Sequence, residues 1–206
     1  IFGFYDGTRE GATGAMKETM KMSLLAERAE FMLRFLEEPA KIGSITPSSM
    51  FLARKMLGEL PWPELDTIVE LGAGTGVFTG YISQHKQKSA KTLVVEQDRS
   101  MRETLRERYP EFFYGTRAEE LPALLRYFNL PQADCVISGL PFATFSKEER
   151  NQVLLAVSQS LKTNGVFVAF QYSLQMRSLV KKYFREVRIR FAPLNFPPAF
   201  IYYCKK

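Results

Sequence analysis

The sequence predicts an α/β fold: a doubly wound sheet of seven strands, mostly parallel with an antiparallel last strand, preceded by N-terminal helices. From residue 67 onward, short apolar runs alternate with helical stretches, which is typical of a mostly parallel sheet covered on both faces. After residue 185 two apolar runs follow each other across a proline-rich turn. A connection that short can only join antiparallel strands.

The N-terminal part is predicted to be helical. Residues 17–37 form a first helix, and Pro39 follows its end. Thr46 and Pro47 then supply an N-cap and a first-turn residue for a second helix. Residues 1–15 are set aside as a tag or a disordered leader. The apolar stripe of the first helix has helical spacing and consists of Leu25, Ala29, Met32 and Leu36.

Five strands then alternate with helices before the antiparallel pair. The last of these helices opens with Ser146 and Glu149 in capping-box spacing and closes at Asn164 and Gly165. The predicted helices lie near 76–86, 99–109, 118–128 and 146–162. The predicted strands cover 67–71, 92–96, 111–115, 134–138 and 165–170, followed by 186–191 and 199–204.

Composition narrows the protein class. The chain has 206 residues, a net charge of +6 and no apolar run near the roughly 20 residues of a membrane span. Cys135 and Cys204 lie in apolar runs, which indicates buried free thiols and a reducing compartment, so we expect a cytoplasmic protein. Between Arg177 and Arg190 six basic residues face one acid. This run fits either a solvated helix face with an edge strand or a phosphate contact.

The stretch "VELGAGTGVFTG" at 69–80 indicates a nucleotide-type pocket, because a strand runs directly into glycines and then a helix. Two features separate it from a dinucleotide loop. Glu70 precedes the glycines and would repel a pyrophosphate, and Val77 stands where the third fingerprint glycine belongs. Glu96 ends the second strand, where we expect a carboxylate to accept hydrogen bonds from two ribose hydroxyls; an exposed acid at a strand end is the alternative.

The motifs "VELGAGTG", "VVEQD" and "SGLPF", with the closing antiparallel pair, resemble class I S-adenosylmethionine-dependent methyltransferases over residues 40–204. The resemblance implies a Rossmann-like sheet, S-adenosylmethionine as cofactor, no metal, and one domain at 16–206 with a helical segment at 16–59. Arg117 departs from the family, which usually has an acid there. The implied cofactor-binding residues are Thr46, Glu70, Gly72, Ala73, Gly74, Gly76, Glu96, Gln97, Ala118 and Glu119.

The stretch "SGLPF" at 138–142 contains no acid, base or strong nucleophile. A sulfonium methyl group is already activated, so the protein needs only to align an electron-rich atom and exclude water. We expect strand-end carbonyls to hold an amine and the Phe142 ring to face its positive charge. A plain turn with Phe142 in the core is the alternative. The expected catalytic set is Ser138, Gly139, Leu140, Pro141, Phe142 and Tyr172, the last of which contacts the amine or a headgroup phosphate or is an inert rim residue.

Adenine methylases place asparagine before Leu-Pro-Tyr, whereas this chain has Gly139 there. Together with "FMLRFLEEP", "GVFVAFQYS" and "LNFPPAF", the stretch resembles bacterial phospholipid N-methyltransferases, relatives of the ribosomal RNA adenine dimethylases. This implies methyl transfer to the amine headgroup of a phosphatidylethanolamine-like lipid, by a protein peripheral on the inner face of the cell membrane. Ribosomal RNA adenine N6-methylation, with RNA as partner, is the alternative, and a non-catalytic binding module is a third hypothesis. The first helix fits either a membrane surface or a lid over the cofactor.

Overall fold

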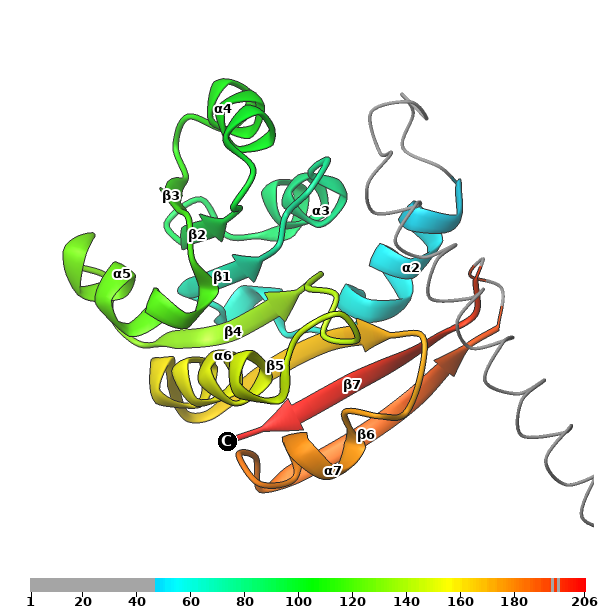
Figure 1. Ribbon diagram of the computed structural model, residues 1–206. Coiled ribbons are helices and arrows are strands. Elements are labelled where there is room, and N and C mark those ends of the chain that lie inside the picture. The colour runs from blue at the N-terminus through cyan, green and yellow to red at the C-terminus, as the bar shows by residue number, and fades with distance from the viewer. Residues whose placement is uncertain (1–46, 194, 196) are drawn as a thin grey trace, which may run out of the picture. The chain divides into compact units, whose positions relative to one another are not determined.

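The computed structural model describes residues 47–193, 195 and 197–206. The helix expected at 17–37 and the N-cap expected at Thr46 lie outside these residues. The described part contains a seven-stranded sheet with strand order β3-β2-β1-β4-β5-β7-β6 (Figure 1). The strands are β1 (Thr67–Leu71), β2 (Lys91–Val95), β3 (Phe113–Gly115), β4 (Ala133–Ser138), β5 (Leu161–Gln171), β6 (Glu186–Ala192) and β7 (Ala199–Lys205).

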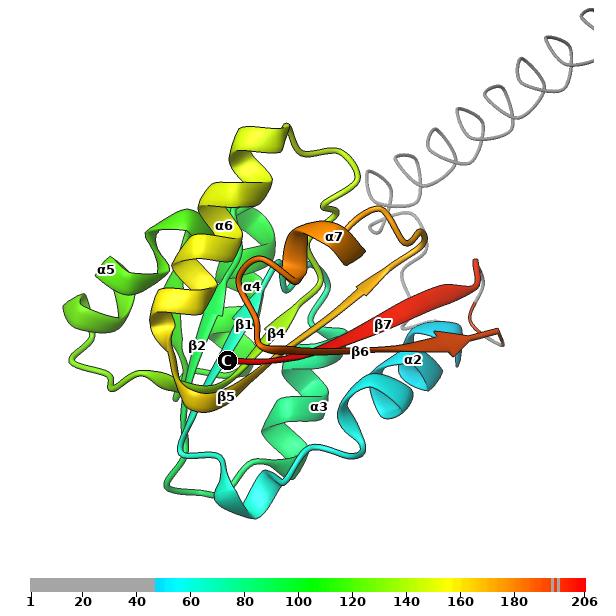
Figure 2. The ribbon, with the colours of Figure 1, turned by 90° about the horizontal axis from the view of Figure 1, so that it is seen from below.

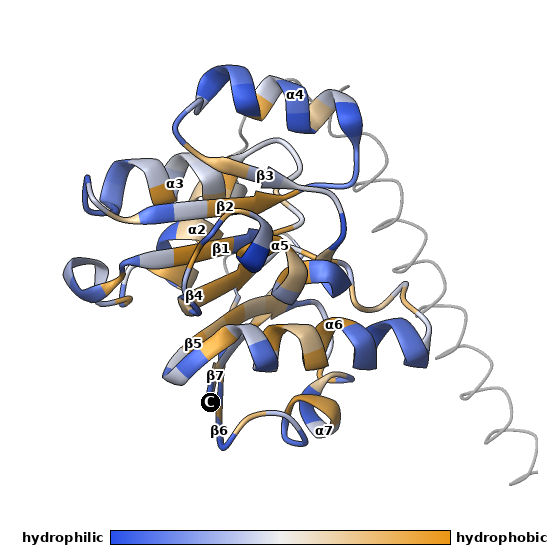
Figure 3. Cartoon of the chain, turned by 90° about the vertical axis from the view of Figure 1, so that its left-hand side faces the viewer, coloured by the Kyte–Doolittle hydropathy of each residue, from blue (hydrophilic) through white to orange (hydrophobic). Residues whose placement is uncertain are grey.

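The strand directions confirm the predicted fold class. Strands β1 to β5 pair parallel with one another, while β7 pairs antiparallel with both β5 and β6. The central strands are apolar along most of their length, as Figure 3 shows, because both faces of the sheet are covered.

Helices cover both faces of this sheet. Figure 2 shows α2 and α3 on one side and α5, α6 and α7 on the other. Each face has its own apolar core, one containing Met56, Ile82 and Leu105, the other Leu121, Leu154 and Val180. The helices are α2 (Pro47–Leu57), α3 (Val77–His85), α4 (Arg99–Arg108), α5 (Leu121–Tyr127), α6 (Lys147–Ser160) and α7 (Arg177–Val180), with 3-10 turns η1 (Trp62–Glu64) and η2 (Ala118–Glu120).

Two predicted boundaries were wrong. The single helix expected at 118–128 is a 3-10 turn followed by α5, with Pro122 in the first turn, where a missing N–H costs no hydrogen bond. Strand β5 starts at Leu161, although the polar residues after it look like a turn. Those residues form an irregularity inside the strand, where Asn164 has φ 65° and the register with β4 shifts. The capping box of α6 is present as predicted.

The strand order of the sheet changes direction between β1 and β4. Connections after β1 and β2 lead toward β3, whereas β4 lies on the other side of β1 and the order continues to β5. Ligands of open α/β sheets bind at such a switch point, outside the carboxyl ends of the strands. Leu71 pairs with both Val95 and Ser138, so the segments after β1, β2 and β4 leave the sheet at the same level.

Candidate functional site

The glycine loop after β1 has a backbone that only glycine adopts easily. Gly72, Gly74 and Gly76 have φ values of 71°, 53° and 85°, all in the left-handed region. Gly72 also packs tightly, because a Cβ there would lie 2.9 Å from Leu140 Cδ2. At Gly74 a Cβ would meet no atom within 4 Å. The loop is therefore close-packed on one side and open above Gly74, which leaves room for a ligand against its backbone.

The Glu96 carboxylate holds the glycine loop in place. Its Oε2 accepts the Gly74 N–H at 2.7 Å, and its Oε1 accepts the Asp98 N–H at 2.9 Å. The side chain is 9% exposed. Each carboxylate oxygen has a second lone pair, so Glu96 retains acceptor capacity for ribose hydroxyls. Glu96 thus joins the loops after β1 and β2 into one cradle.

Glu70 is a fully buried acid directly before the glycines. Its Oε2 accepts the Thr79 hydroxyl of α3 at 2.7 Å, while no described residue hydrogen-bonds its Oε1. Burial, and secondarily the nearby Glu96 carboxylate, raises the pKa of Glu70 to about 8. The carboxyl group is therefore mostly protonated at neutral pH, and a cationic ligand beside it would favour the ionised form.

These observations fit the cofactor that the motifs imply. The open space above Gly74 suits close approach of a ligand, and the unpartnered Glu70 oxygen suits an ammonium or sulfonium group. Ala73 is buried within the loop. Thr46, which the resemblance also implied to bind the cofactor, lies outside the described residues.

The segments after β2 and β3 contain the residues expected to border the adenine. The Glu96 N–H donates to Gly115 O, so these two segments leave the sheet side by side. Gln97 is exposed, and Ala118 is buried at the start of η2. Arg117 binds the Glu119 carboxylate through its Nε at 2.8 Å. Arg117, where the family usually has an acid, therefore pairs with the acids that follow it, Glu119 and Glu120.

The stretch 138–142 lies directly against the glycine loop. The Gly139 N–H donates to Leu71 O at 2.8 Å, which continues the β1–β4 pairing by one residue. A Cβ on Gly139 would lie only 2.7 Å from Gly72 O. The Ser138 hydroxyl is buried and accepts the Leu140 N–H at 3.2 Å, so it shapes the turn. The backbone at Gly139 and the side chain of Leu140 therefore both lie against the glycine loop.

Most carbonyl groups of this turn already have donors. Leu140 O accepts the Phe142 N–H at 2.9 Å and Gln171 Nε2 at 3.0 Å. Pro141 O accepts both the N–H and the hydroxyl of Thr144. Since a carbonyl oxygen has two lone pairs, both groups are saturated.

Arg150 of α6 donates hydrogen bonds to two further carbonyl groups of the turn. Its Nε donates to Phe142 O at 2.7 Å and its second guanidinium nitrogen to Ala143 O at 3.1 Å. No described residue donates to Gly139 O. Among the carbonyl groups of residues 139–143, that of Gly139 is therefore the one without a donor among the described residues.

Phe142 corrects one expectation. Its ring is 1% exposed, belongs to the core on the α6 face and contacts Phe145 edge-on at 5.6 Å. The ring offers no π face to a methylated nitrogen in this structure, so the alternative of a core phenylalanine describes its side chain. Burying a phenyl ring is strongly favourable, and the turn has no other large apolar anchor at this depth.

Tyr172 follows β5 and is partly buried against Phe170, with the two rings edge-on at 5.6 Å. Burial raises the pKa of its hydroxyl. The phenol therefore stays protonated at neutral pH and acts as a hydrogen-bond partner, not as a proton acceptor in its anionic form. Its role in catalysis stays a prediction.

Two positioning residues escaped the sequence analysis. Gln171 is 5% exposed and holds the Leu140 carbonyl from the end of β5, and Thr79 holds Glu70 from α3. A polar residue at the end of a buried strand was the available indication for Gln171. Gln171 binds a residue 31 positions away, and Thr79 binds a strand residue from the following helix, so no local sequence pattern indicates either pairing.

Comparisons with known proteins agree with this site. A family model described as a methyltransferase domain matches residues 68–165. An ornithine lipid N-methyltransferase from Singulisphaera acidiphila is 32% identical over 85% of this chain and 94% of its own length.

Solved structures share the fold. A SAM-dependent methyltransferase from Aquifex aeolicus matches with a TM-score of 0.63 at 14% identity, over 82% of this chain and 97% of that one. Human N-acetylserotonin methyltransferase in complex with SAM matches with a TM-score of 0.58 at 12% identity, over 84% and 55%. The glycine cradle, the switch-point topology and these relatives lead to one conclusion: the chain belongs to the class I S-adenosylmethionine-dependent methyltransferases.

Proposed function

We propose that this enzyme methylates the amine headgroup of a membrane phospholipid of the phosphatidylethanolamine type. The relative from Singulisphaera acidiphila carries a lipid N-methyltransferase name, and its similarity covers most of both chains. The structural observation that carries the proposal is the backbone contact between Gly139 and Gly72.

That contact weighs against an adenine base as the acceptor. In adenine methylases an asparagine side chain at the position of Gly139 holds the exocyclic amino group. Here a Cβ would meet Gly72 O at 2.7 Å, so an asparagine needs a different course of the glycine loop. A single carbonyl without a donor, that of Gly139, suits a small aliphatic amine better than a planar base.

The chemistry asks little of the side chains. Bound S-adenosylmethionine supplies a methyl group activated by its positive sulfur. The Gly139 carbonyl accepts an N–H of the neutral amine and so directs the nitrogen lone pair. The Gly139 carbonyl would keep this lone pair in line with the methyl group, and the N–H proton lost on methylation would pass to water. The Tyr172 hydroxyl supports the amine or a headgroup phosphate as a neutral hydrogen-bond partner.

We also propose that the enzyme acts as a peripheral protein on the cytoplasmic face of the membrane. None of the described helices is long and apolar enough to cross a bilayer. The amine headgroups lie at the membrane surface, so a peripheral position brings them to the carboxyl edge of the sheet.

The test is methyl transfer from labelled S-adenosylmethionine to vesicles of phosphatidylcholine that contain phosphatidylethanolamine. We expect label in the lipid fraction, and none with phosphatidylcholine alone, whose amine is fully methylated. Vesicles with an ornithine-headed lipid identify the alternative headgroup. Label in ribosomal RNA from an unmethylated strain, with none in any lipid, would overturn the proposal.

A further inference from the structure

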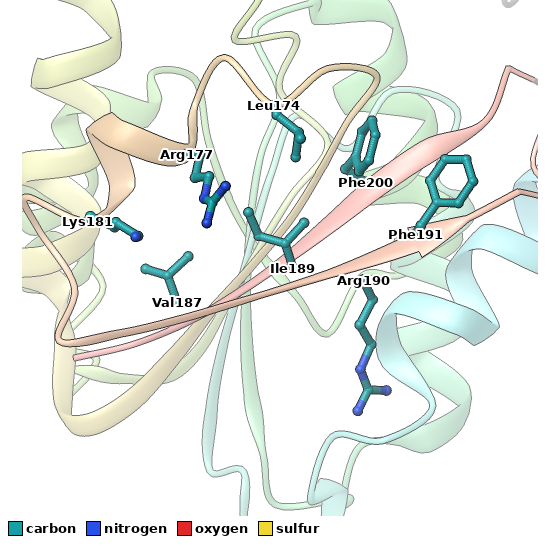
Figure 4. Close-up of a pocket in the computed structure, with 8 residues that line it drawn as sticks. All are labelled: Leu174, Arg177, Lys181, Val187, Ile189, Arg190, Phe191 and Phe200. Carbon is teal, nitrogen blue, oxygen red and sulfur yellow. The ribbon is translucent and has the colours of Figure 1, made fainter.

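A surface groove beside α7 combines an apolar floor with cationic side chains (Figure 4). Its volume is about 380 Å³. Arg177 and Lys181 project into it from the side of α7, over the outer face of the last two strands. The apolar lining consists of Leu174, Val187, Ile189, Phe191 and Phe200.

The floor is more apolar than an edge strand in water needs to be. Leu174 and Phe191 are 45% and 51% exposed, and Phe191 contacts Phe200 with ring centroids 5.1 Å apart. Strand β6 is the outermost strand of the sheet, where exposed apolar residues favour aggregation. Neighbouring exposed apolar side chains of this kind are typical of a surface that binds a protein, a membrane or a ligand.

The cations around the groove are available. Neither Arg177 nor Lys181 forms an ion pair with any described residue, and no acid lines the groove. Arg190 differs, because it binds Glu59 and lies over the Tyr203 ring on the other face of the strand. Two cations without an ion pair among the described residues, over an apolar floor, match a molecule with an anionic group and a hydrocarbon part.

The groove adjoins the candidate active site. Phe200 pairs directly with Gln171, so their side chains lie on the same face of neighbouring strands. Gln171 in turn holds the Leu140 carbonyl of the acceptor turn. Phe191 pairs with Phe200 from the other side. The apolar end of the groove therefore starts one residue pair away from the turn that receives the amine.

We infer that this groove seats an anionic phospholipid of the membrane, with an acyl chain along the apolar floor and its phosphate held by Arg177 and Lys181. Three of the five apolar lining residues, Leu174, Val187 and Ile189, are aliphatic, and the Phe191 ring packs against Phe200, so the floor suits a hydrocarbon chain better than a run of stacked bases. The choice of a lipid rests on the proposed function. Docking through this edge presents the carboxyl ends of the strands, and with them the acceptor turn, to the headgroup layer.

The test is binding of the full chain, without cofactor, to phosphatidylcholine vesicles with and without phosphatidylglycerol. We expect binding only with phosphatidylglycerol, weakened by added salt. The R177Q/K181Q variant should bind these vesicles roughly 10- to 30-fold more weakly, since each cation near an anionic membrane surface strengthens binding by roughly 3- to 5-fold. The K88Q/R126Q variant removes the same charge from exposed positions elsewhere and should bind nearly as the parent does.

Two further variants separate charge from fold. R177K/K181R keeps the charges and should restore binding, while L174S/F191S should weaken it with both cations present. Equal binding of R177Q/K181Q and K88Q/R126Q would overturn the inference. So would loss of RNA binding, or of self-association, in R177Q/K181Q with vesicle binding intact. Because these assays need no methyl transfer, they are independent of the label experiment: a chain that docks but labels no lipid contradicts only the proposed function.

Discussion

At the scale of single residues, two buried acids divide the work of the cofactor cradle. Glu96 uses both oxygens to hold backbone N–H groups of two loops. Glu70 uses one oxygen for Thr79 and leaves the other without a partner among the described residues. The first acid is structural before any ligand arrives, whereas the second is poised to gain a charge when a cation binds.

Glu70 should make the stability of the protein depend on pH. Its pKa rises from 4.5 to about 8 on folding, so between these values the folded protein holds a proton that the unfolded chain has released. Stability therefore falls as the pH rises through this window, by at most about 1.4 kcal/mol per pH unit. Glu70→Gln removes this loss. Denaturant unfolding at several pH values should show the variant gaining on the parent toward pH 8, and parallel profiles would contradict the assignment.

Glu96→Ala should weaken binding of S-adenosylhomocysteine by about 1–3 kcal/mol, the usual loss for a hydrogen-bonded charge. The variant loses the carboxylate expected to bind the ribose and releases the Gly74 and Asp98 N–H groups. Calorimetry measures the affinity. Glu107→Ala, an exposed acid on α4, is the matched control, and equal affinities of the two variants would show that Glu96 does not face the cofactor.

At the scale of elements, the turn after β4 is shaped by its neighbours. Gln171 reaches it from β5 and Arg150 from α6, so the two elements that follow β4 fix the carbonyl groups of the turn. The turn is rigid before an acceptor binds, which keeps the reorganisation cost of alignment low. Its accuracy depends on side chains that touch no substrate.

Gln171→Leu should therefore lower turnover by about 10- to 100-fold, because a small displacement of the acceptor turn misaligns the amine. The affinity for S-adenosylhomocysteine should change little, since the glycine loop keeps its contact with Glu96. Steady-state kinetics and calorimetry together give both values. Gln175→Leu, at an exposed neighbouring position, serves as control; a loss of cofactor affinity equal to the loss of turnover would instead assign Gln171 to the cradle.

Phe142 and Tyr172 should respond in opposite ways. Phe142→Ala removes a buried ring and should cost about 3–5 kcal/mol of unfolding free energy. Tyr172→Phe removes only a hydroxyl of a partly buried side chain and should lower turnover with stability nearly unchanged. Denaturant unfolding and turnover are measured on both variants. If Phe142→Ala kept its stability but lost turnover, the ring would instead belong to the substrate site.

The sequence predicted the strands well because β1, β2 and β4 are buried on both faces and stand out as apolar runs. The glycine positions were also predictable, since their backbone angles exclude other residues. The direction of the Phe142 ring was not, because an apolar residue in a turn can face the core or a ligand. The link from Gln171 to Leu140 spans 31 residues, and no local pattern encodes such a contact.

At the scale of the whole molecule, the cofactor cradle and the groove beside α7 lie on different parts of the sheet. The cradle uses the segments after β1, β2 and β4, and the groove uses β6, β7 and α7. Two ligands of different chemistry should therefore protect different segments of the backbone.

Hydrogen exchange should resolve these two regions. S-adenosylhomocysteine should slow exchange at residues 72–76, 96–98 and 139–143, and at a hundredfold excess over its dissociation constant should stabilise the fold by about 2.7 kcal/mol. Vesicles with phosphatidylglycerol should instead slow exchange at residues 174–191. Protection of the same segments by both ligands would mean that the two sites are one.

Strand β7 follows β6 in the chain but lies between β5 and β6 in the sheet. Strands β5 and β6 are therefore made first but do not pair with each other, because β7 occupies the position between them. While the ribosome is still making residues 199–205, the edges of β5 and β6 are both unpaired, and Gln171 at the end of β5 lacks its neighbour Phe200. A growing chain thus exposes two unpaired strand edges until residues 199–205 have left the ribosome, so chaperone dependence should be highest during that interval.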